Sequence, residues 1–206
     1  MLLSAPSPLA EHHLLENFSS GTPSLDDWLR KRARANQTSG ASRTFVVCDG
    51  TRVVGYYALA SGAIGVLEAT GKFRRNMPDP IPIAILARLA VDRTYQGRGL
   101  GRALFKDIAH RIMHAADTIG IRGVVVHAIS EEAKAFYLAL GFSVSPHDPM
   151  TLMVPLTDLR SIFSTLKVPN TRTRAAMAEA DEIVRTHQAR FKTATELFDD
   201  IEKNNH

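Results

Sequence analysis

The amino-acid sequence predicts a mixed α/β fold, because apolar segments of strand length alternate with segments of helical periodicity. Two early strands are joined by Asp49-Gly50, a dipeptide typical of a tight hairpin turn. A later, strongly apolar strand leads through a glycine-rich turn into a long helix. Together these features predict a sheet with helices packed against it.

The composition is that of a globular protein without a membrane anchor. Hydrophobic residues make up 45% and charged residues 22% of the 206 residues, so a core of ordinary size is expected. No segment approaches the roughly 18 apolar residues of a membrane span, and the N-terminus lacks the basic start of a signal peptide. The single cysteine, Cys48, excludes an intramolecular disulfide, and its apolar neighbours predict burial. We therefore expect a cytoplasmic protein.

Local signals define the individual elements. A first helix is expected over about Leu25–Ala35. The expected strands are residues 43–48, 53–60, 83–91, 123–128, 142–144 and 150–155. Two more helices are expected, one from the glycine-rich turn to about Ala116 and one over residues 132–140. Residues 74–82 contain three prolines and are expected to form a loop.

A boundary at Pro169-Asn170 divides the chain into a main domain, residues 1–166, and a C-terminal segment, residues 167–206. Two short amphipathic helices are expected in this segment, the second beginning with the capping box Thr193-Ala194-Thr195-Glu196. The segment has too few apolar residues for a core of its own. We therefore expect it to pack on the main domain or on a partner chain.

The most informative segment, residues 88–104, combines a buried strand, a short loop and a helix whose first turn carries glycines. Such a turn presents unpaired backbone N–H groups and the positive end of the helix dipole, which suit an anion such as pyrophosphate. Glycines that allow close approach alternate with arginines that add positive charge: Gly97, Arg98, Gly99, Gly101 and Arg102. The net charge of +4 is compatible with a polyanionic ligand, although surface solvation explains it equally well.

Two other phosphate-binding patterns do not fit. A dinucleotide-binding fold places this turn after its first strand, with an acidic residue about 20 residues on. Here the turn is in mid-chain, and the next strand ends in Val126-His127-Ala128. The P-loop pattern that ends in Lys-Ser/Thr is also absent from the sequence.

The run Gln96-Gly97-Arg98-Gly99-Leu100-Gly101 resembles the Gln/Arg-x-x-Gly-x-Gly/Ala motif of the GNAT acetyltransferases, and residues 135–142 resemble their later Phe-Tyr…Gly-Phe element. The resemblance implies a mostly antiparallel sheet, acetyl-CoA as cosubstrate and no metal. It implies that strand backbone pairs with the pantetheine arm and that the glycine-rich turn holds the pyrophosphate. The implied strand residues are Leu89, Ala90 and Val91, and those of the turn are Gln96, Gly97, Arg98, Gly99, Leu100, Gly101 and Arg102.

Further segments, among them Leu25-Asp26-Asp27-Trp28-Leu29 and Val126-His127-Ala128, resemble the GNAT toxins of bacterial type II toxin–antitoxin systems. This resemblance covers about residues 5–163. It implies acetylation of the α-amino group of aminoacyl-tRNA, which blocks translation. It also implies a homodimer and an antitoxin partner, and operator DNA would be bound only through that antitoxin.

The same resemblance makes Tyr137 the expected catalytic residue. A phenol near the sulfur donates the proton that the departing thiolate of CoA needs. From the residues alone, a core tyrosine on an amphipathic helix is an equally good interpretation of Tyr137. His127 ends a strand beside the site and is the weaker candidate for a general base, because buried strand histidines are common.

Two basic clusters are candidates for contacts with tRNA phosphates, although each charge alone fits an ordinary solvated surface. The clusters are Arg30, Lys31 and Arg34 on the first helix and Lys72, Arg74 and Arg75 in the loop before the central strand. Residues 168–203 resemble the C-terminal part of RelB/DinJ-type antitoxins without the DNA-binding half. That likeness suggests self-inhibition, or else a docking or dimerising helix pair without a regulatory role.

The sequence leaves two alternatives to the toxin function open. One is acetylation of a protein or a small-molecule amine. The other is a regulatory module that binds acetyl-CoA without catalysis. The intact Gln96–Gly101 motif and Tyr137 favour an enzyme.

Overall fold

A computed structural model describes residues 3–166 of the chain. The chain divides into two compact units, Met1–Thr165 and Leu166–His206. The hypotheses on residues 167–206, including the antitoxin-like helices and their inhibitory role, lie outside the described residues and stay predictions. The domain boundaries stay a prediction as well.

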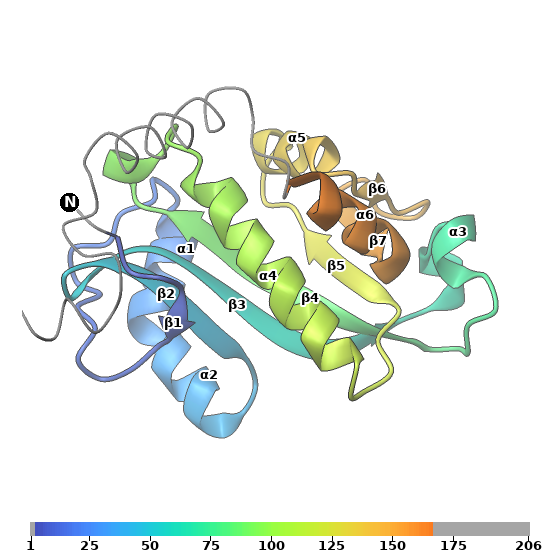
Figure 1. Cartoon of the computed structure of the whole chain (residues 1–206), viewed down its shortest axis with the longest axis horizontal. Helices are drawn as coiled ribbons and strands as arrows, with labels where there is room; N and C mark the ends of the chain where they lie inside the picture. The colour runs from blue at the N-terminus through green and yellow to red at the C-terminus, as the bar shows by residue number, and fades with distance from the viewer. Residues whose placement is uncertain (1–2, 167–206) are drawn as a thin grey trace, which may run out of the picture. The chain divides into compact units, whose positions relative to one another are not determined.

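A seven-stranded sheet forms the centre of the first unit, in the order β1-β2-β3-β4-β5-β7-β6 (Figure 1). The strands are β1 (Ser7–Pro8), β2 (Arg43–Asp49), β3 (Arg52–Ile64), β4 (Ile81–Val91), β5 (Gly123–His127), β6 (Ser143–Val144) and β7 (Thr151–Pro155). All neighbouring strands are antiparallel except β4 and β5, which are parallel. This arrangement confirms the mixed, mostly antiparallel sheet.

Helices cover both faces of the sheet. The front face, as drawn in Figure 1, is covered by α4 (Leu100–Ala116), α5 (Glu131–Ala139) and α6 (Leu156–Leu166). The back face is covered by α1 (Pro23–Lys31) and α2 (Ala33–Ser39), and by α3 (Gly71–Arg74) farther along. None of the helices among residues 3–166 is long and apolar enough to cross a membrane.

The strands sort their side chains between the two faces by alternation. On β5, Val124 and Val126 pack into the front core, whereas Val125 packs with Phe73 and Met153 on the back. The same alternation sends the side chain of His127, the last residue of β5, to the back face. His127 therefore lies on the same face of the sheet as Val125.

Several predictions of local structure are confirmed. The hairpin at Asp49-Gly50 forms, with Gly50 at a φ of 62°. Cys48 is buried, and α4 presents Leu104, Ile108 and Ile112 to the core as its periodicity predicts.

Two predictions were wrong. The helix expected over Leu25–Ala35 is interrupted at Arg32, whose φ of −123° lets a second helix start at Ala33 and continue to Ser39. The predicted loop over residues 74–82 is too long at both ends, because Arg74 is the last residue of α3 and both Ile81 and Pro82 belong to β4. Proline is tolerated there because β5 pairs with β4 only from Ala84 onward, so the start of β4 is an edge on that side.

Gly123 begins β5 where a side chain has no room. A Cβ atom there would overlap the Val154 carbonyl oxygen and lie 2.6 Å from the ring of Phe73. We expect Gly123→Ala to lower the free energy of unfolding by about 1–3 kcal/mol, measured by urea denaturation. Gly120→Ala is the matched control, because a Cβ atom at Gly120 has no other atom within 4 Å. Equal stability of the two variants would contradict this packing.

Candidate active site

The parallel strands β4 and β5 separate in the middle of the sheet. They pair only over Ala84–Leu86 and Val124–Val126. At Ala87 the register of β4 against β3 shifts by one residue, the signature of a β-bulge, and such a bulge bends the strand. Beyond this point no described strand pairs with Ala87–Val91 on the β5 side. The Ala87 and Val91 carbonyls accept hydrogen bonds from the Arg88 and Gln96 side chains, and the other backbone groups on that edge are open to a ligand.

The separation opens a cleft of about 560 Å³, which we call the central cleft. Its walls are residues 85–91 of β4, residues 126–130 at the end of β5, Tyr137 of α5 and parts of the segment Ser20–Leu25. Leu89 packs towards the front core and Ala90 towards the back core. The cleft therefore has walls on both faces of the sheet.

A second hollow of about 440 Å³, the phosphate hollow, lies at the start of α4 and shares Val91 and Gln96 with the central cleft. Gly97 and Gly99 adopt φ values of 72° and 83°, which favour glycine, and a Cβ atom at either has no other atom within 4 Å. The first backbone bond of α4 runs from the Ala103 N–H to the Gly99 carbonyl (3.0 Å). The three N–H groups between them therefore have no carbonyl of the helix to pair with.

The other residues predicted for this turn take different positions. Gly101 and Arg102 line the phosphate hollow, and Arg102 is exposed. Arg98 is also exposed, with its guanidinium 5.5 Å from the centre of the Tyr95 ring. Leu100 lines the hollow and packs against the front core. The phosphate hollow thus combines N–H groups that have no helix carbonyl partner with the positive charge of Arg102, and the exposed Arg98 precedes Gly99 in the same turn. This arrangement suits a polyphosphate.

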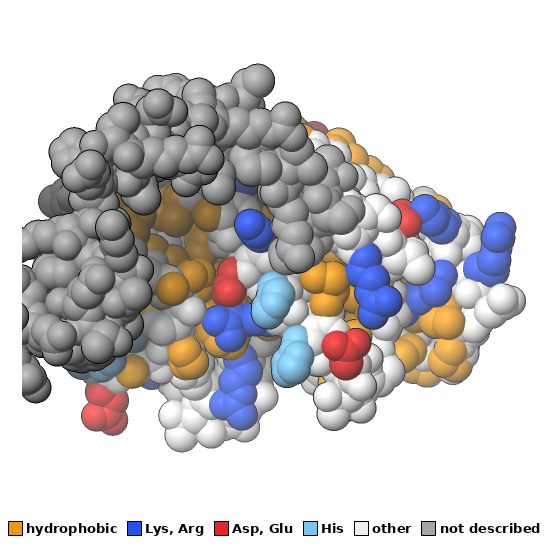
Figure 2. Space-filling view, viewed as in Figure 1, with side chains coloured by type: hydrophobic (Ala, Val, Ile, Leu, Met, Phe, Trp, Pro, Cys, Tyr) orange, Lys and Arg blue, Asp and Glu red, His pale blue; other side chains and the backbone are white. Residues whose placement is uncertain are grey.

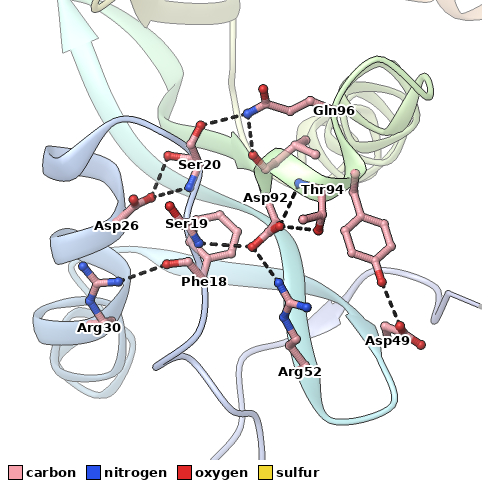
Figure 3. A network of polar contacts seen from close by, with 12 residues as sticks. Phe18, Ser19, Ser20, Asp26, Arg30, Asp49, Arg52, Asp92, Thr94 and Gln96 are labelled. Carbon is pink, nitrogen blue, oxygen red and sulfur yellow. Dashed lines mark hydrogen bonds and ion pairs between the residues drawn. The ribbon is translucent and has the colours of Figure 1, made fainter.

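The side chain of Gln96 connects two parts of the wall of the central cleft. Its amide nitrogen donates to the carbonyl oxygens of Ser20 (2.8 Å) and Val91 (2.9 Å), as Figure 3 shows. The motif residue therefore ties the N-terminal segment to the end of β4. The Gln96 amide nitrogen therefore has both of its hydrogen-bond partners within the protein.

Asp92, which the sequence analysis missed, fixes the same wall (Figure 3). It is buried and accepts hydrogen bonds from the Ser19 N–H (3.1 Å), from Arg52 (3.0 Å) and from the Thr94 N–H and hydroxyl (3.0 and 2.6 Å). Burial alone would raise the pKa of Asp92, but these hydrogen bonds and the Arg52 charge hold it below the usual value. The segment that contributes Ser20 to the cleft is thus held by an ionised carboxylate.

Tyr137 lies on α5, whose start is capped by the Ser130 hydroxyl accepting from the Ala133 N–H (3.2 Å). The tyrosine ring is 6% exposed and packs between Phe136 and Phe142. Burial raises the pKa of Tyr137 above that of free tyrosine, so the phenol stays protonated near neutral pH. Among residues 3–166 its hydroxyl has no hydrogen-bond partner, and the residue lines the central cleft. Tyr137 is therefore placed to donate a proton.

Two further side chains that can bind a ligand or exchange a proton, Arg88 and His127, line the back side of the cleft. Arg88 follows the bulge, donates to the Ala87 carbonyl (2.5 Å) and lies over the Trp28 ring at 5.5 Å. His127 lies at the mouth, exposed, with Nδ1 near Thr151 and Asp148. The expectation of a buried strand histidine was therefore wrong. Within the described part of the chain, no three His, Cys, Asp or Glu side chains gather as a metal site.

The basic clusters differ in how freely their charges face solvent. Arg30 pairs with Asp27 and donates to the Phe18 carbonyl, and Arg34 donates to two backbone carbonyls of the N-terminal segment. The two remaining paired cations are Lys31, with Asp27, and Lys72, with Asp158. Arg74 and Arg75 are exposed and have no ion-pair partner among the described residues. Figure 2 shows Lys and Arg side chains gathered at the end of the domain where α3 lies.

Comparison with known proteins agrees with this geometry. Residues 40–144 match the acetyltransferase (GNAT) domain family. A tRNA-acetylating toxin of Mycobacterium tuberculosis is 53% identical over 160 residues, which cover 78% of this chain and 96% of that protein. A probable toxin TacT of Sinorhizobium fredii is 31% identical over 157 residues, which cover 71% of this chain and 87% of that protein.

Solved structures share the fold. AtaT complexed with acetyl-methionyl-tRNAfMet has a TM-score of 0.72 and 25% identity, covering 78% of this chain and 99% of that chain. A tyrosine-to-phenylalanine mutant of AtaT, bound to acetyl-CoA and to the C-terminus of the antitoxin AtaR, has a TM-score of 0.68 and 25% identity, covering 80% and 99%. The glycine-rich turn, the parted strands and these likenesses agree, and the chain belongs to the GNAT acetyltransferase family.

Proposed function

We propose that this protein transfers the acetyl group of acetyl-CoA to the α-amino group of aminoacyl-tRNA and acts as a toxin by blocking translation. The observation that carries the proposal is the 53% identity to a tRNA-acetylating toxin over almost all of that protein's length. The cleft supports it, because it shares Val91 and Gln96 with the phosphate hollow and is also lined by Arg88 and the hydroxyls of Ser20, Thr22 and Ser24.

The residues present fit acetyl-CoA. The open glycines of the phosphate hollow leave room for a pyrophosphate against backbone N–H groups, and Arg98 and Arg102 supply positive charge. No described strand pairs with Leu89–Val91 on the β5 side, so backbone groups there, apart from the Val91 carbonyl held by Gln96, are available to an amide-containing arm. When bound, acetyl-CoA supplies an acetyl group already activated as a thioester. The protein contributes a fixed position and a place for protons to go.

Tyr137 is the catalytic acid of this proposal. Its hydroxyl keeps its proton near neutral pH and has no competing partner among the described residues. A neutral phenol beside the sulfur donates to the leaving thiolate. Burial raises the pKa of Tyr137, so the residue enters the reaction as a neutral phenol rather than as a phenolate.

Partners follow from the same proposal. We expect a cytoplasmic protein, since charged tRNA is found there, and an antitoxin as the binding partner that silences it. Operator DNA would be bound only through such an antitoxin. A homodimer belongs to the same proposal, and sedimentation analysis of the full chain tests it.

The proposal is tested by acetyl transfer from labelled acetyl-CoA to bulk charged tRNA. The full chain and a chain ending at Leu166 are assayed side by side, because the C-terminal segment is a predicted inhibitor. Label on charged tRNA, but not on uncharged tRNA, is the expected result with at least one of them. Label on a protein or a small amine alone would favour the alternative acceptors, and acetyl-CoA binding without transfer would favour a silent module.

In the active form, Tyr137→Phe should lower kcat by roughly 100-fold or more, the range for losing a general acid. The ring packing is preserved, so the affinity for acetyl-CoA should change less than about twofold. Single-turnover kinetics and calorimetric titration measure the two quantities. Full activity in this variant would remove Tyr137 from the mechanism.

Gly99→Glu should abolish acetyl-CoA binding, because a charged side chain would fill the anion site. Gly40→Glu is the control. Gly40 ends α2 at a φ of 80°, close to the 83° of Gly99, and a Cβ atom there also has no other atom within 4 Å. Both variants therefore carry the same backbone strain. Loss of acetyl-CoA binding in both would mean that strain, and not the anion site, is responsible.

The Arg74→Gln, Arg75→Gln double variant should weaken tRNA binding and reduce the salt dependence of the affinity, because unpaired cations are free to replace counterions. Filter binding at several salt concentrations measures both. Arg30→Gln is the comparison, since Arg30 is already engaged by Asp27 and the Phe18 carbonyl. An unchanged salt slope in the double variant would show that this pair does not contact tRNA.

A further inference from the structure

His127 and Tyr137 line the same cleft from opposite faces of the sheet. Tyr137 belongs to the front core, with α4 and α5. The side chain of His127 lies on the back, because it follows Val125 by two residues and Val125 packs on that face. Thr151, its neighbour on β7, is on the same face by the same rule, two residues before Met153. The cleft thus has a tyrosine on its front face and a histidine on its back face.

The surroundings of His127 define which nitrogen is free. The Thr151 hydroxyl donates to Asp148 Oδ2 (2.7 Å), so its oxygen accepts from His127 Nδ1, 3.1 Å away. Asp148 Oδ2 is 3.3 Å from the same Nδ1. These contacts place the imidazole hydrogen on Nδ1 and leave the Nε2 lone pair available. In the described residues, Nε2 has no hydrogen-bond partner of its own.

Asp148 is held as a carboxylate. The Thr151 hydroxyl and the Met150 N–H donate to it, and these hydrogen bonds keep its pKa below the usual value. An imidazolium forming at His127 would therefore meet a negative charge at 3.3 Å. The His127 side chain is 65% exposed, which gives the proton a path to water.

The other groups facing the cleft do not accept protons. From the back side they are Arg88, which is always charged, and the neutral hydroxyls of Ser20, Thr22 and Ser24. From the front side there is Tyr137, which holds its proton. No aspartate, glutamate or lysine is found among the described residues that line the cleft.

We propose that His127 Nε2 accepts a proton from the α-ammonium group of the acceptor, with Asp148 as the positioning residue. This inference rests on the proposed function. The freed nitrogen lone pair forms the C–N bond at the thioester carbonyl, the C–S bond breaks, and the electron pair on sulfur takes the proton of Tyr137. A second proton leaves nitrogen as the amide forms and restores the tyrosine, while His127 releases its own proton to water.

The test is His127→Gln in the full chain, with a hydrolysis-resistant, amide-linked aminoacyl-tRNA as acceptor. A free α-amino group has a pKa of about 7.7–8.0, so only roughly a tenth is neutral at pH 7. We expect kcat/KM to fall about tenfold at pH 7 and less than about twofold at pH 9, where water has already removed the proton. Asp148→Asn should lower kcat/KM at pH 7 less than His127→Gln does, and its loss of kcat/KM should likewise be smaller at pH 9 than at pH 7.

His114→Gln is the matched control, because His114 is exposed in the last turn of α4 and does not line the cleft. Acetyl-CoA affinity should be unchanged in all three variants. No deficit in His127→Gln, or one of equal size at pH 7 and pH 9, would overturn the inference while leaving the function intact. Absence of transfer to aminoacyl-tRNA at both pH values, by the wild-type full chain and by the wild-type chain ending at Leu166 alike, would overturn both.

Discussion

Strand β4 loses its parallel neighbour after Leu86, and the rest of the site depends on this separation. Backbone groups in the middle of a sheet normally satisfy one another, so a strand that leaves its partner exposes donors and acceptors that need a ligand or water. The bulge at Ala87 bends β4 away while β3 continues to support its other edge. Beyond the bulge, one edge of β4 is therefore held by β3, whereas the other edge has no strand partner among the described residues. A preformed slot of this kind suits an extended, amide-containing arm.

Polar contacts fix the wall of the central cleft near the C-terminal end of β4. Gln96 and Asp92, from the loop after β4, both hold the Ser19-Ser20 segment, of which Ser20 lines the central cleft (Figure 3). The loop that presents the phosphate hollow is thus the loop that positions the acceptor wall. Asp92 is the buried carboxylate that holds this loop and the Ser19-Ser20 segment together.

The sequence predicted six of the seven strands and the glycine-rich turn, because each rests on a local pattern, whereas β1 was missed. Tyr137 became the catalytic candidate through the resemblance to the GNAT toxins. The break at Arg32 and the strand position of Pro82 were not predictable locally, since both depend on neighbours distant in the sequence. The same holds for Asp92, whose partners Ser19 and Arg52 are 73 and 40 residues away. His127 was visible as a candidate, but its exposure and its contact with Asp148 appear only when β5 and β7 are paired.

The central claim is that the sheet opening holds the thioester between a front-side acid and a back-side acceptor wall. A crystal structure of the protein with a non-hydrolysable acetyl-CoA analogue tests this claim most directly. We expect the pantetheine arm along Leu89–Val91, the sulfur within hydrogen-bonding distance of the Tyr137 hydroxyl, and the carbonyl carbon open towards His127. An analogue bound with its sulfur on the back face, or outside the β4–β5 opening, would contradict the account.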